Sequence, residues 1–246
     1  MHIHIIGNKG IVGSANEKTL LMSKQHEITG SDKNEELYKE ADIFLICVPE
    51  QAILSVLKKV HNLKGLPVIR STVRPDIIQS IKQVYIKHFC INPEFLKAHT
   101  AFWDCYFPKG LIIGDCCEEH GKLVEKMWGF IRAPIYHVTQ EEASIIKLSS
   151  NNYAAMLISF WNNLKIVCDK LNININDVSR ILPLIDERVS KYGTLAGAAY
   201  GGTCLPKDVK QFINMCKNLE LNTDLFEAVE GINSWYKEST ISRGGL

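Results

Sequence analysis

The chain has almost no excess of charge of one sign. Its 246 residues carry 28 Lys and Arg against 27 Asp and Glu, a formal net charge of +1 at pH 7. Proteins that hold nucleic acid or an anionic lipid surface by general electrostatics need a strongly basic face or segment. We therefore expect no nucleic-acid partner and no membrane partner.

The sequence also lacks a long apolar run and a secretion signal. Its densest apolar stretch, residues 154–161, is well short of the ~18 apolar residues that suggest a membrane span. The N-terminus, MHIHIIGNKG, begins like a strand and has neither the charged nor the apolar region of a signal peptide. With 46% hydrophobic and 22% charged residues, the composition is that of a globular protein. We expect a cytoplasmic, soluble protein of one or two domains.

No CxxC pair occurs among the eight cysteines. Without a secretion signal, cysteines in a chain of this length are expected to be free thiols. The adjacent Cys116 and Cys117 have no His or Cys at the spacing of a zinc finger. His88, His99 and His137 form no readable relay or metal spacing. The sequence therefore predicts no metal site.

The first half of the chain alternates short β-rich runs with helical stretches. Such alternation is typical of parallel βαβ units, with helices covering both faces of one sheet. The strand-like runs are residues 2–6, 27–31, 43–48, 67–69, 84–90, 111–114 and 134–138. They predict a doubly wound, Rossmann-type α/β domain over residues 1–138.

From residue 139 onward the sequence is helical, which predicts an all-helical central domain over residues 139–246. Thr139 and Glu142 form a capping box that opens a helix running to about Leu171. That helix would be ~50 Å long at about 1.5 Å per residue, and it is apolar on nearly every face. We expect two copies of the chain to pair through it as a homodimer. Coverage by the helix's own chain alone is the alternative.

The first predicted strand ends in the glycine turn Gly7, Gly10, Gly13, with the spacing GxxGxxG. Glycines there let the backbone approach a pyrophosphate, and the following helix offers its free N–H groups. Asp32 ends the second strand, 19 residues beyond Gly13. A carboxylate there can accept hydrogen bonds from both ribose hydroxyls and would repel the 2′-phosphate of NADP. The pattern favours NAD, and a tight turn without a cofactor is the alternative.

Cys204 stands out among the cysteines because of its sequence, GGTCLPKD. Pro206 suits the first turn of a helix, which would place Cys204 near the N-cap, where the helix dipole and Lys207 favour the thiolate. Asp208 lies four residues on and so shares a helical face with Cys204. Its carboxylate could act on a water or a substrate hydroxyl. The alternative is an inert thiol.

Two further sets of polar residues are candidates for chemistry. Lys147 and Asn151 lie four residues apart on the long apolar helix, where an ammonium and an amide could stabilise an oxyanion. The alternative places Lys147 at a solvated helix edge. Glu94 follows a predicted strand, in the region where open α/β sheets place ligands. It could instead cap a helix beginning at Phe95.

Five motifs, taken in order, resemble the UDP-glucose/GDP-mannose dehydrogenase family over nearly the whole chain. They are Ser71-Thr72-Val73, Asn92-Pro93-Glu94-Phe95-Leu96, Lys147 with Asn151, Asp186-Glu187-Arg188, and Gly201-Gly202-Thr203-Cys204-Leu205-Pro206-Lys207-Asp208. The resemblance implies oxidation of the primary alcohol of a nucleotide sugar, such as UDP-glucose, to a carboxylate with two molecules of NAD.

The resemblance also implies a role for each catalytic residue. Cys204 would attack the intermediate aldehyde to give a thiohemiacetal, whose oxidation yields a thioester that water hydrolyses. Lys147 and Asn151 would stabilise the oxyanion. Asp208 would activate water, and Glu94 would act as acid or base.

Binding residues follow from the same resemblance. The expected cofactor residues are Gly7, Gly10, Ile11, Val12, Asp32, Val48 and Thr72. Thr72 is also an expected catalytic residue, on the nicotinamide side of the site. The expected substrate residues are Glu94, Phe95, Leu96, Lys147, Asn151, Tyr200, Gly201 and Arg188. Arg188 would reach a substrate either within its own chain or across a dimer interface. Family members generally continue into a third domain that binds the nucleotide, whereas this chain ends soon after Asn233. A non-catalytic or accessory dinucleotide-binding protein is therefore the second hypothesis.

Overall fold

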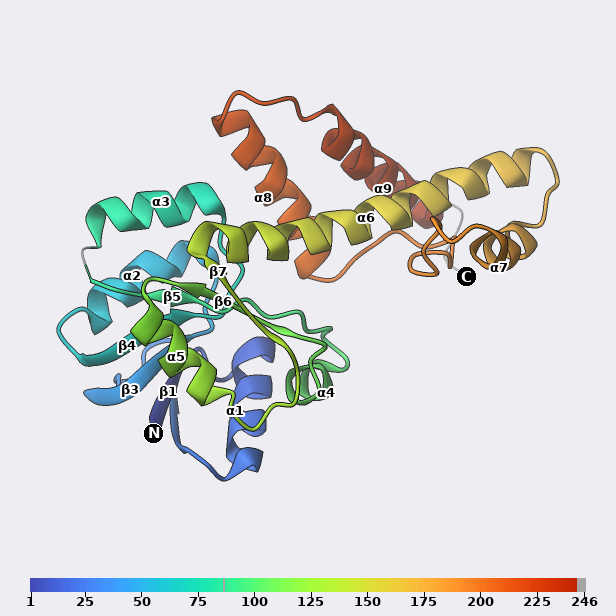
Figure 1. Ribbon diagram of the computed structural model, residues 1–246. Helices are drawn as coiled ribbons and strands as arrows, with labels where there is room; N and C mark the ends of the chain where they lie inside the picture. The colour runs from blue at the N-terminus through green and yellow to red at the C-terminus, as the bar shows by residue number, and fades with distance from the viewer. Residues whose placement is uncertain (86, 243–246) are drawn as a thin grey trace. The chain divides into compact units, whose positions relative to one another are not determined.

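The computed structural model describes residues 1–85 and 87–242 (Figure 1). The chain divides into two compact units, Met1–Lys147 and Leu148–Leu246. The first unit carries a β-sheet, and the described residues of the second contain only helices and loops. The predicted boundary between residues 138 and 139 precedes helix α6 (Gln140–Lys170), which begins in the first unit and continues into the second.

The first unit is built on one seven-stranded sheet in the order β2-β1-β3-β4-β5-β6-β7. The strands are β1 (His2–Ile6), β2 (Glu27–Ser31), β3 (Glu40–Ile46), β4 (Lys64–Ile69), β5 (Cys90–Ile91), β6 (Leu111–Asp115) and β7 (Ile135–Thr139). Strands β1 to β5 pair in parallel, so their carboxyl ends meet at one edge of the sheet. The α/β fold class predicted from the sequence is confirmed.

Two features of the sheet differ from the prediction. The expected strand over residues 84–90 is wrong, because helix α3 (Pro75–Val84) runs to Val84 and the strand covers only Cys90–Ile91. Tyr85 and Phe89 are buried in a loop, which explains why the segment looks strand-like. Strand β6 also pairs antiparallel with β5, through Ile91 and Gly114, and β7 is parallel to β6. The amino end of β5 and the carboxyl end of β6 therefore share an edge.

Helices cover both faces of this sheet. One apolar core includes side chains of α1 (Ile11–Ser23), α4 (Ala101–Tyr106) and α5 (Glu118–Met127). The other includes side chains of α2 (Glu50–Val60), α3 and the first turn of α6. The residues of β3 from Ile43 to Ile46 alternate between the two cores, as the period of two in a strand requires. The arrangement is that of a doubly wound domain.

The second unit consists of α6 from Leu148 onward, α7 (Ile175–Ile185), α8 (Cys204–Asn218) and α9 (Asp224–Ser242). The capping box at the start of α6 is confirmed: Thr139 Oγ1 accepts a hydrogen bond from the N–H of Glu142 at 3.2 Å, and Glu142 Oε2 accepts one from the N–H of Thr139 at 2.8 Å. With 31 residues, α6 is about 46 Å long. No helix in the described ranges combines the length and the apolar character needed to cross a bilayer.

Candidate functional site

The glycine turn after β1 is shaped by close backbone contacts. Gly7 has a φ of +87°, and its N–H donates to the carbonyl of Ser31 at 2.7 Å. A Cβ at Gly7 would lie 2.5 Å from the carbonyl oxygen of Cys47, and one at Gly13 would lie 2.0 Å from the carbonyl oxygen of Gly7. Only glycine fits either position. Gly10 is the N-cap of α1, and no described side chain caps that helix, so its first N–H groups are free for an anion.

Asp32 lies beside this turn, because β2 is the parallel neighbour of β1. Its Oδ2 accepts a hydrogen bond from the N–H of Lys9 at 3.1 Å, and its Oδ1 accepts one from the N–H of Lys33 at 2.6 Å. A carboxylate at the carboxyl edge, next to a cradle that admits no side chain, fits the ribose and pyrophosphate of a dinucleotide.

The other expected cofactor residues lie in loops or turns at this edge of the sheet. Ile11 is 53% exposed on the first turn of α1, and Val12 follows it. Val48 comes after β3, and its Cγ1 is 3.2 Å from the place of a Cβ on Gly7. Thr72 is buried in the loop after β4. The segment after β3 thus packs against the glycine turn, and the segment after β4 leaves the sheet at the same edge.

Glu94 and Lys147 form a buried ion pair in the first unit. Lys147 Nζ lies 3.5 Å from Glu94 Oε1, and the two side chains are 7% (Glu94) and 5% (Lys147) exposed. The ammonium also lies 5.2 Å from the centre of the Phe95 ring, in a cation–π contact. Lys147 is therefore not at a solvated helix edge, and that alternative is wrong.

The capping alternative for Glu94 is also wrong. Residues 92–97 form no helix, and the next helix, α4, begins only at Ala101. Instead, Glu94 Oε2 accepts a hydrogen bond from the N–H of Leu96, and this bond fixes the carboxylate against the backbone of the loop that carries it. Phe95 and Leu96 border a hollow of about 550 Å³ in the same unit. Both lie where a small ligand could touch them.

Arg70 is a buried residue that the sequence reasoning missed. Its Nε donates to Asn16 Oδ1 at 3.0 Å, and its Nη1 donates to Asn92 Oδ1 at 3.0 Å and to the carbonyl of Pro93 at 3.1 Å. The guanidinium also lies 5.0 Å from the centre of the Trp128 ring. Arg70 thus fixes the backbone just before Glu94. A lone arginine directly after the apolar run Leu66–Ile69 is the sequence feature that could have revealed it.

The second unit holds Cys204 and Asp208 on the first turns of α8. Cys204 is the first residue of the helix, with Thr203 as N-cap, and its side chain is exposed. Asp208, one turn further, is 1% exposed. Asp208 Oδ1 lies 2.9 Å from Lys207 Nζ, and its Oδ2 accepts a hydrogen bond from Asn151 Nδ2. The ammonium of Lys207 therefore pairs with Asp208, and the structure joins Asn151 on α6 to Asp208 on α8.

Tyr200 and Gly201 lie just before this helix. The N–H of Tyr200 donates to Asn233 Oδ1 at 2.7 Å, and its carbonyl accepts from Asn233 Nδ2 at 3.1 Å. Burial, and next the charge of Glu230, raise the pKa of Tyr200 to about 12. A Cβ on Gly201 would meet no described atom within 4 Å, so the backbone there is open to approach by a ligand.

Arg188 has a different setting from the other expected substrate residues. Its side chain is 86% exposed, and it is paired with Asp186 through Nε–Oδ1 and Nη2–Oδ2 distances of 2.9 and 2.7 Å. The side-chain and backbone N–H groups of Arg188 lower the pKa of Asp186. An exposed guanidinium of this kind is free to change partners at little cost.

Comparison with known proteins adds a family relationship. Residues 141–235 match the central domain of the UDP-glucose/GDP-mannose dehydrogenase family. A UDP-glucose 6-dehydrogenase from Campylobacter jejuni is 32% identical over 195 residues, which are 72% of this chain and 49% of that protein. One from Rickettsia conorii is 32% identical over 175 residues, 68% of this chain and 40% of that protein. The chain thus spans about half the length, or less, of these relatives.

Two solved structures show the same fold. The chain superposes on a UDP-glucose dehydrogenase from Pyrobaculum islandicum with a TM-score of 0.82 and 21% identity, over 95% of this chain and 68% of that one. It superposes on a UDP-D-ManNAc dehydrogenase from Pyrococcus horikoshii with a TM-score of 0.85 and 18% identity, over 98% of this chain and 70% of that one.

Proposed function

This chain belongs to the UDP-glucose/GDP-mannose dehydrogenase family, as its 32% identity to a UDP-glucose 6-dehydrogenase over 72% of its length shows, and we propose that it oxidises the primary alcohol of a nucleotide sugar to a carboxylate with NAD. The observation that carries this proposal is the start of α8, which exposes the Cys204 thiol and buries Asp208 against Asn151. A thiol at a helix N-terminus suits covalent chemistry on a carbonyl carbon, and a fixed carboxylate one turn further along the helix suits the activation of water.

The glycine turn and Asp32 would hold the cofactor. Gly7 and Gly10 would bring backbone without a side chain to the pyrophosphate, and Asp32 would accept hydrogen bonds from the ribose hydroxyls and disfavour a 2′-phosphate. Val48 lies against this turn, Ile11 and Val12 begin the helix that follows it, and Thr72 is buried in the loop after β4. When bound, NAD would accept two electrons in each of two oxidations.

Cys204 is the proposed nucleophile. Its sulfur forms a bond to the aldehyde carbon, and the carbonyl electron pair moves onto oxygen, where Lys147 and Asn151 stabilise the negative charge. At the acyl stage a water attacks the same carbon, and the carbon–sulfur bond breaks to release the carboxylate and the thiolate. Asp208 positions and activates that water, and Glu94 moves its proton.

Recognition of the sugar would fall to residues flanking these groups. Phe95 and Leu96 offer an apolar surface beside the buried ammonium of Lys147. The backbone of Tyr200 is held by Asn233, and the backbone at Gly201 is open to a ligand. Arg188 offers an exposed guanidinium for an anionic group. A nucleotide sugar carries both an apolar ring face and phosphate charges.

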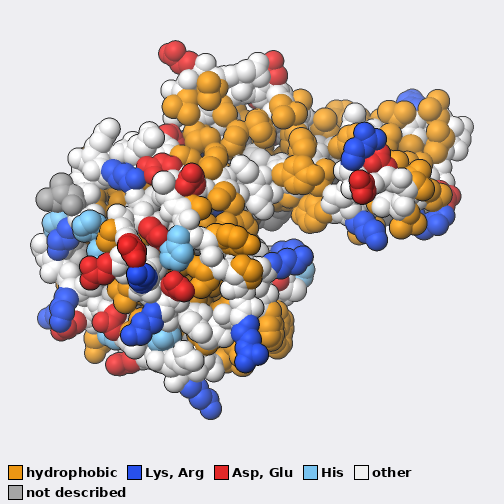
Figure 2. Space-filling view, viewed as in Figure 1, with side chains coloured by type: hydrophobic (Ala, Val, Ile, Leu, Met, Phe, Trp, Pro, Cys, Tyr) orange, Lys and Arg blue, Asp and Glu red, His pale blue; other side chains and the backbone are white. Residues whose placement is uncertain are grey.

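Helix α6 supports a homodimer. Its residues Ile146, Tyr153, Phe160 and Val167 recur every seven positions and are each 39% to 53% exposed. Residues seven apart share one face of a helix, apart from a drift of about 20°. Figure 2 shows further hydrophobic side chains exposed over the helices of the second unit. Two copies pairing along α6 would cover this stripe.

The test is NADH formation with a panel of UDP- and GDP-sugars. We expect one substrate to give two NADH per carboxylate, and Cys204→Ala to lower the rate by more than about 1,000-fold. Cys216→Ala, on the same helix, is the matched control and should retain the rate. Normal turnover by Cys204→Ala refutes the covalent mechanism. Binding of NAD with no turnover of any sugar favours a dinucleotide-binding protein without catalysis.

A further inference from the structure

Four metal-ligating side chains meet at the edge of the sheet opposite the glycine turn. His88 lies in the loop before β5, and Cys116, Cys117 and His120 lie between the end of β6 and the first turn of α5. Because β5 and β6 are antiparallel, the amino end of one and the carboxyl end of the other share this edge. The cluster is therefore separate from the residues proposed to bind NAD.

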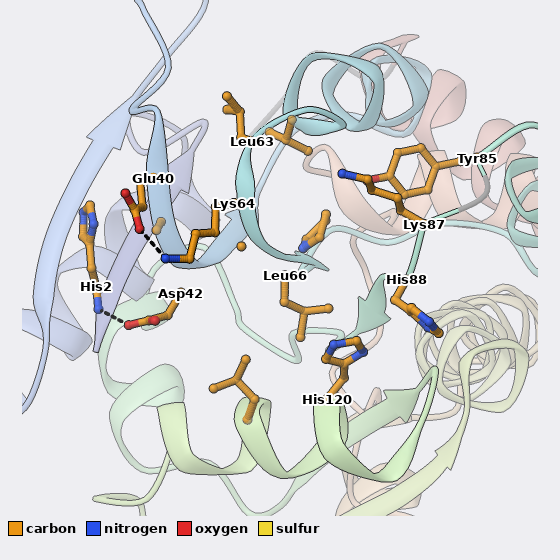
Figure 3. A pocket seen from close by; sticks show the side chains of 15 residues that line it. His2, Glu40, Asp42, Leu63, Lys64, Leu66, Tyr85, Lys87, His88 and His120 are labelled. Carbon is orange, nitrogen blue, oxygen red and sulfur yellow. Dashed lines mark hydrogen bonds and ion pairs between the residues drawn. The ribbon is translucent and has the colours of Figure 1, made fainter.

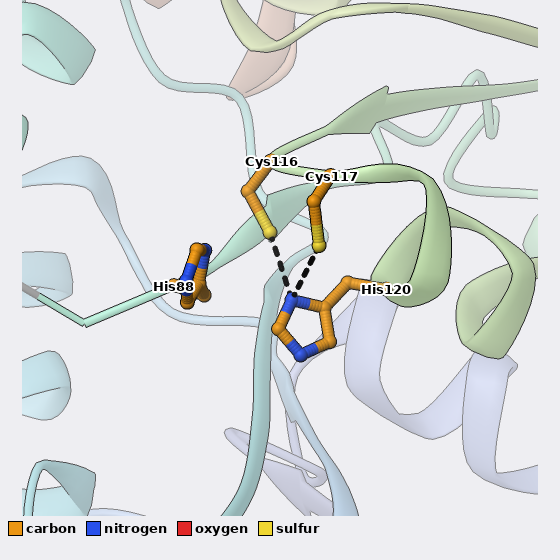
Figure 4. Close-up of side chains that lie close together, drawn as sticks. All are labelled: His88, Cys116, Cys117 and His120. Atoms are coloured by element: carbon orange, nitrogen blue, oxygen red, sulfur yellow. Dashed lines mark hydrogen bonds between the residues drawn. The ribbon is translucent and has the colours of Figure 1, made fainter.

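The ligand atoms of these four residues lie close enough to share one ion. One such atom from each lies within 4.8 Å of every other. Cys116 Sγ and Cys117 Sγ are each 3.2 Å from His120 Nδ1, so both sulfurs face one imidazole nitrogen (Figure 4). In a tetrahedral zinc site, bond lengths of about 2.0–2.3 Å place neighbouring ligand atoms about 3.3–3.8 Å apart. Shifts below about 1 Å for the sulfurs and His120 would reach that geometry.

We propose that Cys116, Cys117, His120 and His88 form a structural zinc site. Two thiolates and two imidazoles are a donor set that zinc binds in closed, four-coordinate sites. Three ligands are fixed by β6 and α5, because Cys117 is the N-cap of that helix and His120 lies on its first turn. His88 is exposed and lies in a loop, so it can close the site as the fourth ligand.

The site has a route to solvent. A hollow of about 770 Å³ lies at this edge of the sheet, and both His88 and His120 line it (Figure 3). Its other walls include the starts of β1, β3 and β4, with His2, Asp42 and Leu66. An ion can enter from there, displacing the two thiol protons as the sulfurs bind. Once bound, it would tie the loop before the two-residue strand β5 to helix α5.

Cobalt binding to the reduced full chain tests the proposal. One equivalent of Co²⁺ should give thiolate-to-cobalt charge-transfer absorption and the intense visible bands of a tetrahedral ion, and Zn²⁺ should remove both. The double variant Cys116→Ser/Cys117→Ser should lose the charge-transfer band and bind more than about 100-fold more weakly, since even outer-shell partners cost about 10–100-fold. His120→Ala should lose the tetrahedral bands.

Two matched control variants each replace a cysteine or a histidine that lies outside the proposed zinc site. Cys204→Ser removes an exposed thiol and His99→Ala an exposed imidazole, and both should keep the native cobalt spectrum. Charge-transfer absorption that survives the double serine variant, or a weak octahedral spectrum in the native chain, overturns the site. Circular dichroism of each variant confirms folding. NADH formation by the native chain is measured separately, so failure of the metal site is distinguishable from failure of the dehydrogenase function.

Discussion

The buried pair of Glu94 and Lys147 leads to a prediction about stability that does not depend on any substrate. At the 3.5 Å separation of Nζ and Oε1, the attraction is about 5 kcal/mol for an effective dielectric constant of about 20. Desolvating two charges costs several kcal/mol each, so the pair as a whole contributes little. Removing one partner alone should destabilise the fold, because the other charge then remains buried without a counter-charge. We expect Lys147→Met to lower the free energy of unfolding by about 3–5 kcal/mol.

A double-mutant cycle separates this effect from loss of packing. Glu94→Gln should also be costly, because it leaves the Lys147 ammonium buried without its carboxylate. The double variant Lys147→Met/Glu94→Leu should be less destabilised than the sum of the single variants by about 2–3 kcal/mol. Urea unfolding followed by circular dichroism gives all four free energies. Single costs below about 1 kcal/mol, or strictly additive ones, would refute the reasoning.

Three further predictions concern other parts of the chain. Arg70→Met removes hydrogen bonds to Asn16, Asn92 and Pro93 and should lower the free energy of unfolding in urea by about 3 kcal/mol or more. Arg70→Lys should recover little of this stability, because an ammonium cannot reproduce the planar hydrogen-bonding geometry of the guanidinium. Burial, with the charge of His2 adding to it, lowers the pKa of His4 from 6.5 to about 4. As the pH falls, the His4 imidazole is therefore protonated first in the unfolded chain. The free energy of unfolding should be highest above pH 6.5 and should decline by about 3 kcal/mol towards pH 4. Urea unfolding at a series of pH values should show a smaller decline in His4→Gln. Phe160→Asp places a charge on the exposed stripe of α6 and should convert the proposed dimer to a monomer in light scattering; an unchanged mass would argue against pairing through this face.

The sequence predicted those parts of the fold that depend on local chemistry. The turn at Gly7 needs a positive φ and a bare Cα, and both requirements can be recognised from glycine spacing. The start of α6 could be predicted because Thr139 and Glu142 cap it through side chains three residues apart. Cys204 could be placed near the start of α8 because Pro206 marks a first helical turn.

Features that depend on distant segments could not be predicted in the same way. A strand-like run carries no direction, so the antiparallel pairing of β5 and β6 was not expected. The burial of Lys147 depends on Glu94, which is far away in the sequence. His88 and Cys116 likewise become neighbours only through that antiparallel pair. The roles proposed for these residues in binding and catalysis remain predictions.

Asn92, directly before the loop that carries Glu94, constrains how this protein can evolve. Its Oδ1 accepts from Arg70 Nη1 at 3.0 Å and from Trp128 Nε1 at 2.9 Å, and its Nδ2 donates to the carbonyl of Ile112 at 2.7 Å. Aspartate would lose the donor, serine could not span all three partners, and glutamine is longer by a methylene. We expect almost no neutral substitution at this position. Phe95, three residues on and 39% exposed, has a cation–π contact with Lys147 in place of three buried hydrogen bonds, so this residue can change more readily while the scaffold beside it stays fixed.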